Sequence, residues 1–221
     1  MKKYKGVIFD FNGTLFFDSK FHAAAWLKYT KEVLKIDITE DFYYKNMHGR
    51  TNPEIYRSLY NKEIPKSIER TFGLSKEKLY REICLQNGPL KFVDGAEQLF
   101  SFLNKKGVPN MIATGSEIEN VSFYKEHMPI DKYFKEKILL DDGSFPGKPN
   151  PDIYLLAAKT IGVNPEDIIV AEDSHGGILA ARAANVGYIV GVSEEAGNFK
   201  DKDLVNKVIT DFYQFPIELI K

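Results

Sequence analysis

Several short apolar runs of this sequence end in side chains that could hold a metal ion and an anion. The run Val7–Phe9 is followed at once by Asp10 and Asn12. Carboxylates, hydroxyls and an ammonium in one place suit chemistry at a phosphoryl group, which depends mainly on positioning and charge stabilisation. The polar side chains that follow the later runs are Thr114, Ser116, Lys148, Glu172 and Asp173, with Gly115 between the first two.

These groups are expected to lie together if the apolar runs are parallel strands, because parallel strands end at one edge of a sheet. Asp10, Glu172 and Asp173 would then repel one another unless a hard cation lay among them. Mg²⁺ suits such a site, since it binds carboxylates, water and substrate phosphate. Lys148 could offset the remaining charge and bind a phosphoryl oxygen as a point charge. Thr114 and the amides after it could donate to other phosphoryl oxygens.

Each of these motifs taken alone also has a structural explanation. Thr114–Ser116 is typical of a turn, and Glu172–Ser174 is typical of a helix cap. Lys148, between a glycine and a proline, would alone be a solvated loop lysine, and Asp10 would alone be a structural residue at a strand end. Their joint occurrence at one sheet edge favours a functional site.

The elements that must position these groups alternate along the second half of the chain. Helices are predicted from Asp94 to Gly107, through Val121 and Tyr124, over 149–161 and over about 177–184, between the strands. Strands separated by helices of this length indicate right-handed crossovers, and hence an α/β fold with a Rossmann-like, doubly wound parallel sheet. The predicted later strands are Val108–Ala113, Lys137–Leu140, Ile168–Ala171 and Tyr188–Val192.

The stretch between the first strand and residue 89 carries helical rather than alternating patterns. His22 and Trp26 recur at helical spacing behind a cap at Asp18 or Ser19, and further helices are predicted near 53–60 and 75–86. Pro65, Gly73 and Gly88 are interpreted as breaks between helices. We therefore predict an α/β core domain over 1–16 and 90–221, interrupted by an all-helical cap domain over 17–89.

Composition limits the possible partners and the compartment. The 221 residues include 30 basic and 31 acidic side chains, a net charge of −1, so we expect no nucleic-acid partner. Cys84 is the only cysteine, which argues against a disulfide framework or a zinc knuckle. The apolar runs are too short for a signal peptide or a membrane span, so we expect a cytoplasmic protein with no membrane partner.

The motifs together resemble those of the haloacid dehalogenase superfamily, whose members transfer phosphoryl groups through an aspartate nucleophile. Two further stretches resemble its β-phosphoglucomutase and phosphoglycolate-phosphatase-like branch: Gly147–Tyr154, and Asp18–Trp26 with His22 and Trp26 at the spacing of that branch. The four motifs are Asp10–Leu15, Thr114–Ser116, Lys148–Pro149 and Glu172–Ser174. The resemblance implies a Rossmann-like core, a helical cap inserted after the first motif, and Mg²⁺-dependent phosphoryl transfer.

The resemblance also implies roles for individual residues. Asp10 would be the nucleophile that forms an aspartyl phosphate, with Thr114 and Lys148 holding the phosphoryl group. The metal would be bound by Asp10, Glu172, Asp173 and the backbone carbonyl of Asn12. Residues expected to contact the substrate are Gly115, Ser116, His22, Trp26, Arg50 and Asn52.

The substrate side of the resemblance leaves alternatives open. The stretch Gly49–Glu54 resembles the cap loop that faces the substrate in this branch, where sugar phosphomutases carry an Arg at the position of Asn52; here Arg50 lies two residues earlier. We therefore expect a monomeric phosphatase of a small phosphorylated metabolite. The alternatives are a β-phosphoglucomutase-like sugar phosphate mutase and a non-catalytic relative that binds a phosphorylated ligand. Haloacid dehalogenases themselves fit poorly, since they work without Mg²⁺ and this chain keeps Glu172–Asp173.

Asn12 departs from the family pattern, in which a second Asp protonates the leaving oxygen and then activates the water that releases the phosphoryl group. An amide can do neither, and losing a general acid and base costs about 10²–10⁴-fold in rate. His22 and His48 are conceivable surrogates from the cap, although packing or orienting roles suit them better. We expect slow turnover of esters with poor leaving groups and a longer-lived aspartyl phosphate.

Replacing Asn12 by Asp is expected to raise the turnover of an aryl phosphate by about 10²-fold or more, because the variant regains a proton donor and acceptor. The measurement is release of p-nitrophenol in the presence of Mg²⁺ by the native chain and by Asn12→Asp. Equal rates would show that proton transfer at this position does not limit turnover.

Overall fold

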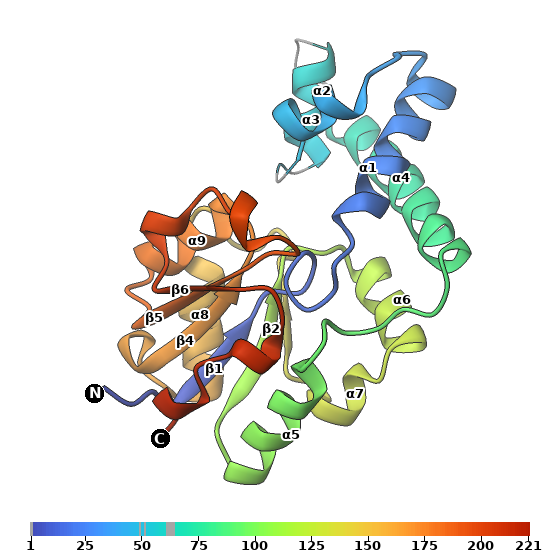
Figure 1. Ribbon diagram of the computed structural model, residues 1–221. Helices are drawn as coiled ribbons and strands as arrows, with labels where there is room; N and C mark the ends of the chain where they lie inside the picture. The colour runs from blue at the N-terminus through green and yellow to red at the C-terminus, as the bar shows by residue number, and fades with distance from the viewer. Residues whose placement is uncertain (1, 49, 51, 61–64) are drawn as a thin grey trace. The chain divides into compact units, whose positions relative to one another are not determined.

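The computed structural model describes residues 2–48, 50, 52–60 and 65–221. Contacts between Cα atoms divide the chain into two compact units. The core unit comprises Met1–Phe17 and Lys91–Lys221, and the helical unit comprises Asp18–Leu90. Figure 1 shows strands and helices in the core unit and helices in the other unit.

A six-stranded, wholly parallel sheet forms the centre of the core unit, in the order β3-β2-β1-β4-β5-β6. In its middle, Phe9 of β1 lies opposite Ile112 of β2 and Ala171 of β4. All strands therefore end at the same edge, and the predicted α/β class with a doubly wound parallel sheet is confirmed. The strands are β1 (Gly6–Phe9), β2 (Asn110–Thr114), β3 (Ile138–Leu140), β4 (Ile168–Glu172), β5 (Tyr188–Val192) and β6 (Lys207–Ile209).

Helices cover both faces of the sheet (Figure 1). On one face Ile8 and Val170 pack into an apolar cluster with residues of α8 and α9. On the other face Phe9 makes edge-on ring contacts with Phe100 of α5 and with Phe134 and Phe212. Strands buried on both faces are continuously apolar, which explains the short apolar runs of the sequence. The helices of this unit are α5 (Ala96–Lys106), α6 (Ile118–His127), α7 (Ile130–Tyr133), α8 (Asp152–Ile161) and α9 (His175–Ala183).

Some element boundaries differ from those predicted. Helix α5 has Gly95 rather than Asp94 at its N-cap, and that glycine has a φ of 82°. Helix α8 begins at Asp152, after the two prolines that precede it, rather than at residue 149. Strand β6, which is three residues long, was not predicted.

The helical unit contains α1 (Ser19–Tyr29), a π-helical turn (Thr30–Leu34), α2 (Glu40–Asn46), α3 (Asn52–Tyr60) and α4 (Lys66–Gln86). Its apolar centre is aromatic, with Trp26, Tyr29 and Tyr56 buried together. Gly73 lies inside α4, so the predicted break at this residue is wrong. A glycine inside a helix costs only about 1 kcal/mol relative to alanine, and packing of α4 along α1 outweighs that cost.

A buried ion pair on α4 contacts residues of the neighbouring helices of this unit. The Lys76 ammonium lies 2.8 Å from a carboxylate oxygen of Glu77, and both residues are less than 5% exposed. Asn52 donates to the same oxygen at 3.0 Å. Burial alone would raise the pKa of Glu77, but the charges of Lys76 and His22 and the hydrogen bonds lower it to about 2. The Lys76 ammonium also lies 5.4 Å from the ring centre of Trp26.

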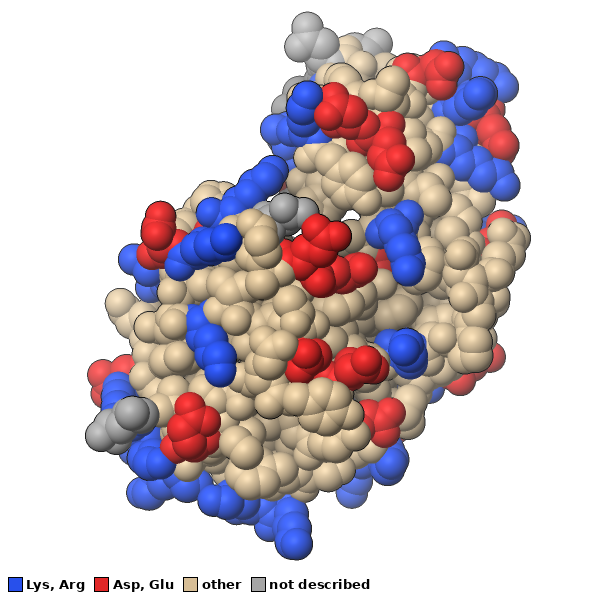
Figure 2. All heavy atoms as spheres, in the orientation of Figure 1, with Lys and Arg blue, Asp and Glu red and all other residues tan. Residues whose placement is uncertain are grey.

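No described helix is both long enough and apolar enough to cross a lipid bilayer. On the face that Figure 2 shows, acidic and basic side chains are interspersed over the surface.

Replacing Glu77 by Gln is expected to destabilise the helical unit by about 3–5 kcal/mol at pH 7, because Lys76 would stay buried without its counter-charge. The pKa of Glu77 is lower in the folded than in the unfolded chain. The contribution of Glu77 to the free energy of unfolding is therefore complete when the pH is above the ordinary pKa of a glutamate. It is lost as the pH falls toward 2. Urea unfolding at pH 7 and about pH 3.5 should show a smaller difference between native and variant at the lower pH.

The matched control is Glu82→Gln on the same helix, where the side chain is exposed. It should change the free energy of unfolding by less than about 0.5 kcal/mol. Equal effects of the two substitutions at pH 7 would contradict an important role for the buried pair.

Candidate active site

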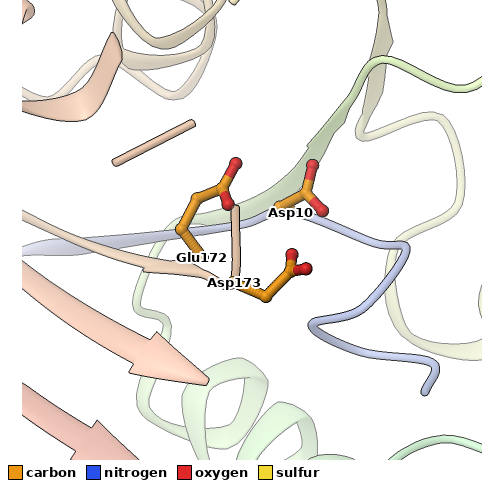
Figure 3. Close-up of side chains that lie close together, drawn as sticks. All are labelled: Asp10, Glu172 and Asp173. Carbon is orange, nitrogen blue, oxygen red and sulfur yellow. The ribbon is translucent and has the colours of Figure 1, made fainter. Parts of the chain in front are cut away.

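Three carboxylates gather where β1 and β4 end (Figure 3). Asp10 follows β1 directly, Glu172 is the last residue of β4, and Asp173 follows it. One oxygen of each carboxylate lies within 4.8 Å of the others. Strands β1 and β4 are neighbours in register, so their ends must bring these side chains together.

Lys148 bridges two of the three carboxylates. Its ammonium lies 2.6 Å from an oxygen of Asp10 and 2.6 Å from an oxygen of Glu172. Burial would lower the pKa of Lys148, but the adjacent charges of Asp10 and Glu172 raise it well above its ordinary value. Lys148 is therefore a permanent positive charge beside Asp10.

Glu172 is fully buried and held by four donors. One oxygen accepts from Lys148 and, at 3.0 Å, from the Tyr154 hydroxyl. The other oxygen accepts from the backbone N–H of Ser174 at 2.8 Å and from its hydroxyl at 3.0 Å. A Cβ on Gly177 would lie 1.5 Å from this carboxylate, so only glycine fits there. Glu172 thus has a fixed orientation beneath the site.

Asp173 completes the group of charges. One of its oxygens accepts from the Thr14 hydroxyl at 2.9 Å. Burial, followed by repulsion from Glu172 and Asp10, raises the pKa of Asp173 well above its ordinary value. The other oxygen lies against Gly13, where a Cβ would come within 2.1 Å and where φ is +73°.

The donor set fits a divalent cation. Three carboxylates and one ammonium leave two negative charges when all are ionised, which Mg²⁺ would balance. Such an ion would favour the charged form of Asp173, whose pKa is raised by burial and by the neighbouring carboxylates. Hard oxygen ligands also match the preference of Mg²⁺. Asp10, Glu172 and Asp173 are the side chains that could hold it.

The end of β2 contributes hydroxyl and amide groups to the same edge of the sheet. The Thr114 hydroxyl donates to Ser116 Oγ at 3.1 Å, and the Ser116 hydroxyl donates to the side-chain oxygen of Asn12. The amide nitrogen of Asn12 donates to the Tyr124 hydroxyl at 2.8 Å. Gly115 is exposed between Thr114 and Ser116. The core unit therefore brings together all the site residues predicted within it.

The other predicted site residues belong to the helical unit. His22 Nδ1 lies 2.8 Å from the Lys76 ammonium, and its ring stacks on Tyr80 at 3.9 Å between ring centres. Trp26 is buried in the aromatic centre of that unit, and Arg50 is exposed. In the predicted cap loop, Gly49 and Thr51 lie outside the described residues. Contact of His22, Trp26, Arg50 or Asn52 with a substrate stays a prediction.

Sequence reasoning missed two tyrosines that touch this site. Tyr124 contacts Asn12, and Tyr154 contacts Glu172. Both lie on helices whose apolar faces pack against the core, so periodicity indicates only a buried ring at each position. The hydroxyl contacts depend on the distance between helix and strand end, which no local pattern encodes.

Comparison with known proteins gives consistent similarities. A model of the haloacid dehalogenase-like hydrolase family matches residues 4–185. A phosphorylated carbohydrates phosphatase of Thermotoga maritima is 26% identical over 191 residues, 85% of this chain and 85% of that protein. A β-phosphoglucomutase of Mycobacterium bovis is 24% identical over 219 residues, 87% of this chain and 82% of that protein.

The crystal structure of a haloacid dehalogenase hydrolase, family IA, variant 3, from Entamoeba histolytica is also similar. It superposes with a TM-score of 0.89 at 36% identity, covering 99% of this chain and 97% of that one. The likeness therefore extends over both units rather than over the sheet alone.

Replacing Gly13 by Ala is expected to weaken Mg²⁺ binding by about 10-fold or more, because the added methyl group displaces the Asp173 carboxylate. The measurement is a calorimetric titration with Mg²⁺. The matched control is Gly143→Ala, where φ is +79° but nothing lies within 4 Å of the added carbon. The control carries the same backbone strain and should keep native affinity. Equal losses in the two variants would attribute the effect to backbone strain instead.

Proposed function

Because this chain belongs to the haloacid dehalogenase-like hydrolase family, we propose that it is a Mg²⁺-dependent phosphatase of a small phosphorylated metabolite. The resemblance found in its sequence motifs is confirmed by the family match and by the similar structures. The observation that carries the proposal is the position of Asp10, a carboxylate at a strand end with Lys148 at 2.6 Å and two further carboxylates within 4.8 Å.

In the proposed reaction, one oxygen of Asp10 attacks the phosphorus of the substrate, and the bond from phosphorus to the ester oxygen breaks. The alcohol leaves with a proton, and Asp10 carries the phosphoryl group. Water then attacks that phosphorus, which releases inorganic phosphate and regenerates the carboxylate. A bound Mg²⁺ would supply charge stabilisation for the phosphoryl oxygens.

Protein groups around Asp10 have distinct parts in this proposal. Lys148 keeps its charge. Its ammonium can stabilise an oxygen of the substrate's phosphoryl group when that oxygen lies between Lys148 and Asp10. The Thr114 hydroxyl and the exposed backbone at Gly115 can donate to other phosphoryl oxygens. Glu172 holds Lys148 in place and contributes negative charge to the metal site.

Asn12 makes this a slow enzyme in the proposal. Its amide offers hydrogen bonds but exchanges no proton, so the leaving alcohol and the attacking water must exchange protons with solvent. Charge stabilisation by Lys148 is unaffected, because it requires no proton transfer at position 12.

We propose a phosphorylated sugar or a similar polyol as the substrate class. Support comes from the Thermotoga maritima relative, whose name gives phosphorylated carbohydrates as its substrates. A sugar phosphate mutase is the second candidate, favoured by the relative named β-phosphoglucomutase. Against the mutase, Asn52 is engaged with Glu77, and Arg50 lies two residues before the position at which such mutases carry their Arg.

The test is release of inorganic phosphate from p-nitrophenyl phosphate and from a panel of sugar phosphates, with Mg²⁺ and with EDTA. We expect release with Mg²⁺ only. Asp10→Asn should lower it by about 10³-fold or more, because the nucleophile is lost. The exposed Asp131→Asn on α7 is the control and should keep native rates.

Two other outcomes would favour the alternatives. Interconversion of sugar phosphate isomers without free phosphate would indicate a mutase. Tight Mg²⁺-dependent binding of phosphorylated metabolites with no turnover, even of the aryl phosphate, would indicate a binding protein.

A further inference from the structure

Hydrogen bonds run in one direction from the end of β2 through Asn12 to α6. The backbone N–H of Ser116 donates to Thr114 Oγ1 at 3.1 Å, and the Thr114 hydroxyl donates to Ser116 Oγ at 3.1 Å. The hydroxyl hydrogen of Ser116 is therefore directed to the side-chain oxygen of Asn12. The amide nitrogen of Asn12 in turn donates to Tyr124 at 2.8 Å. Both ends of the Asn12 carboxamide are thus held.

Tyr124 is fixed by its surroundings. It is 1% exposed, and its ring stacks on that of Phe11 with 4.6 Å between centres and 26° between planes. Its ring also meets that of Phe16 edge-on at 6.1 Å. Phe11 lies between Asp10 and Asn12 in the chain, so the stack connects α6 directly to the segment that carries the proposed nucleophile.

We propose that Tyr124 is a positioning residue, whose hydroxyl holds the side chain of Asn12 in one orientation beside Asp10 during phosphoryl transfer. The inference rests on the proposed phosphatase function. Tyr124 acts through Asn12, because its ring is buried and its hydroxyl meets the amide. The role is distinct from that of a proton donor that touches the substrate.

The chemistry of the pair explains why an amide suits this position. In the observed arrangement Tyr124 accepts a hydrogen from position 12, and only the amide of Asn, not the ionised carboxylate of Asp, can donate it. Ser116 meanwhile donates to the oxygen of the same side chain. Asn12 is therefore part of a matched set of donors and acceptors, which makes position 12 a fixed and neutral hydrogen-bonding group.

Removing the hydroxyl alone tests the proposal. Tyr124→Phe keeps the stacked ring and should lower kcat for p-nitrophenyl phosphate with Mg²⁺ by about 10-fold, with KM changed by less than about two-fold, because the loss concerns orientation rather than binding. In an Asn12→Ala background the same substitution should have no further effect, since there is no amide to hold.

The matched control is Tyr133→Phe in the same unit. That tyrosine is also buried, and it donates to Glu97 at 2.6 Å through a hydroxyl unconnected to the site. The Tyr133→Phe substitution removes a comparable hydrogen bond and should leave kcat and KM at native values.

A spectroscopic measurement tests the contact without turnover. The side-chain amide signal of Asn12 in a ¹⁵N–¹H correlation spectrum is identified by its absence in Asn12→Ala. In Tyr124→Phe this signal should shift and its hydrogens should exchange faster with solvent, whereas in Tyr133→Phe it should stay at its native position.

The outcomes separate this inference from the proposed function. An unshifted amide signal in Tyr124→Phe would overturn the contact, and a shifted signal with native kcat would overturn the positioning role. An equal loss of kcat in the Tyr124→Phe and Tyr133→Phe variants would also overturn the positioning role. So would an undiminished effect of Tyr124→Phe in the Asn12→Ala background. Absence of turnover in the native chain would overturn the proposed function and with it the kinetic role, while the amide signal would still decide whether Tyr124 holds Asn12.

Discussion

Repulsion among Asp10, Glu172 and Asp173 is the constraint that the surrounding structure has to offset, since one oxygen of each lies within 4.8 Å of the others. At an effective dielectric constant near 20, two unit charges at about 4 Å repel by about 4 kcal/mol. Lys148 offsets part of this by contacting two of the three carboxylates. Gly13 and Gly177 leave space for the carboxylates of Asp173 and Glu172, respectively, with which any side chain at these positions would collide. The negative charge that remains would favour a divalent cation at this edge of the sheet.

The sequence was sufficient to predict the fold class and to place the charged groups of the core unit at one edge of the sheet. The reason is geometric: strands joined by helical crossovers run parallel, so a polar residue after each strand falls at the same edge. Asp10 and Glu172, far apart in the chain, meet for this reason, whereas Lys148 reaches them from the segment between β3 and α8. The roles assigned to them in catalysis stay predictions, because geometry places groups without showing what they do.

What the sequence could not predict depends on packing between distant segments. Gly73 is a local signal for a break, yet it lies inside α4, which is held by the helices packed along it. The contact between Tyr124 and Asn12 depends on how closely α6 approaches the end of β1. A periodic pattern identifies a buried tyrosine but does not say what its hydroxyl meets. The departure at Asn12 was visible in the sequence; the partners that accommodate it were not.

The two units differ in how their buried charges are balanced. In the helical unit Lys76 is neutralised by Glu77 at 2.8 Å, and Asp18 accepts from the Tyr80 hydroxyl at 2.5 Å. His22 lies between Lys76 and Asp18, with Nδ1 2.8 Å from the Lys76 ammonium and Nε2 3.4 Å from Asp18. These charges are satisfied within the unit. The carboxylates of the core unit exceed the ammonium that contacts them, so their full ionisation calls for a cation from solution. The excess of negative charge therefore belongs to the core unit, and the buried charges of the helical unit have partners within that unit.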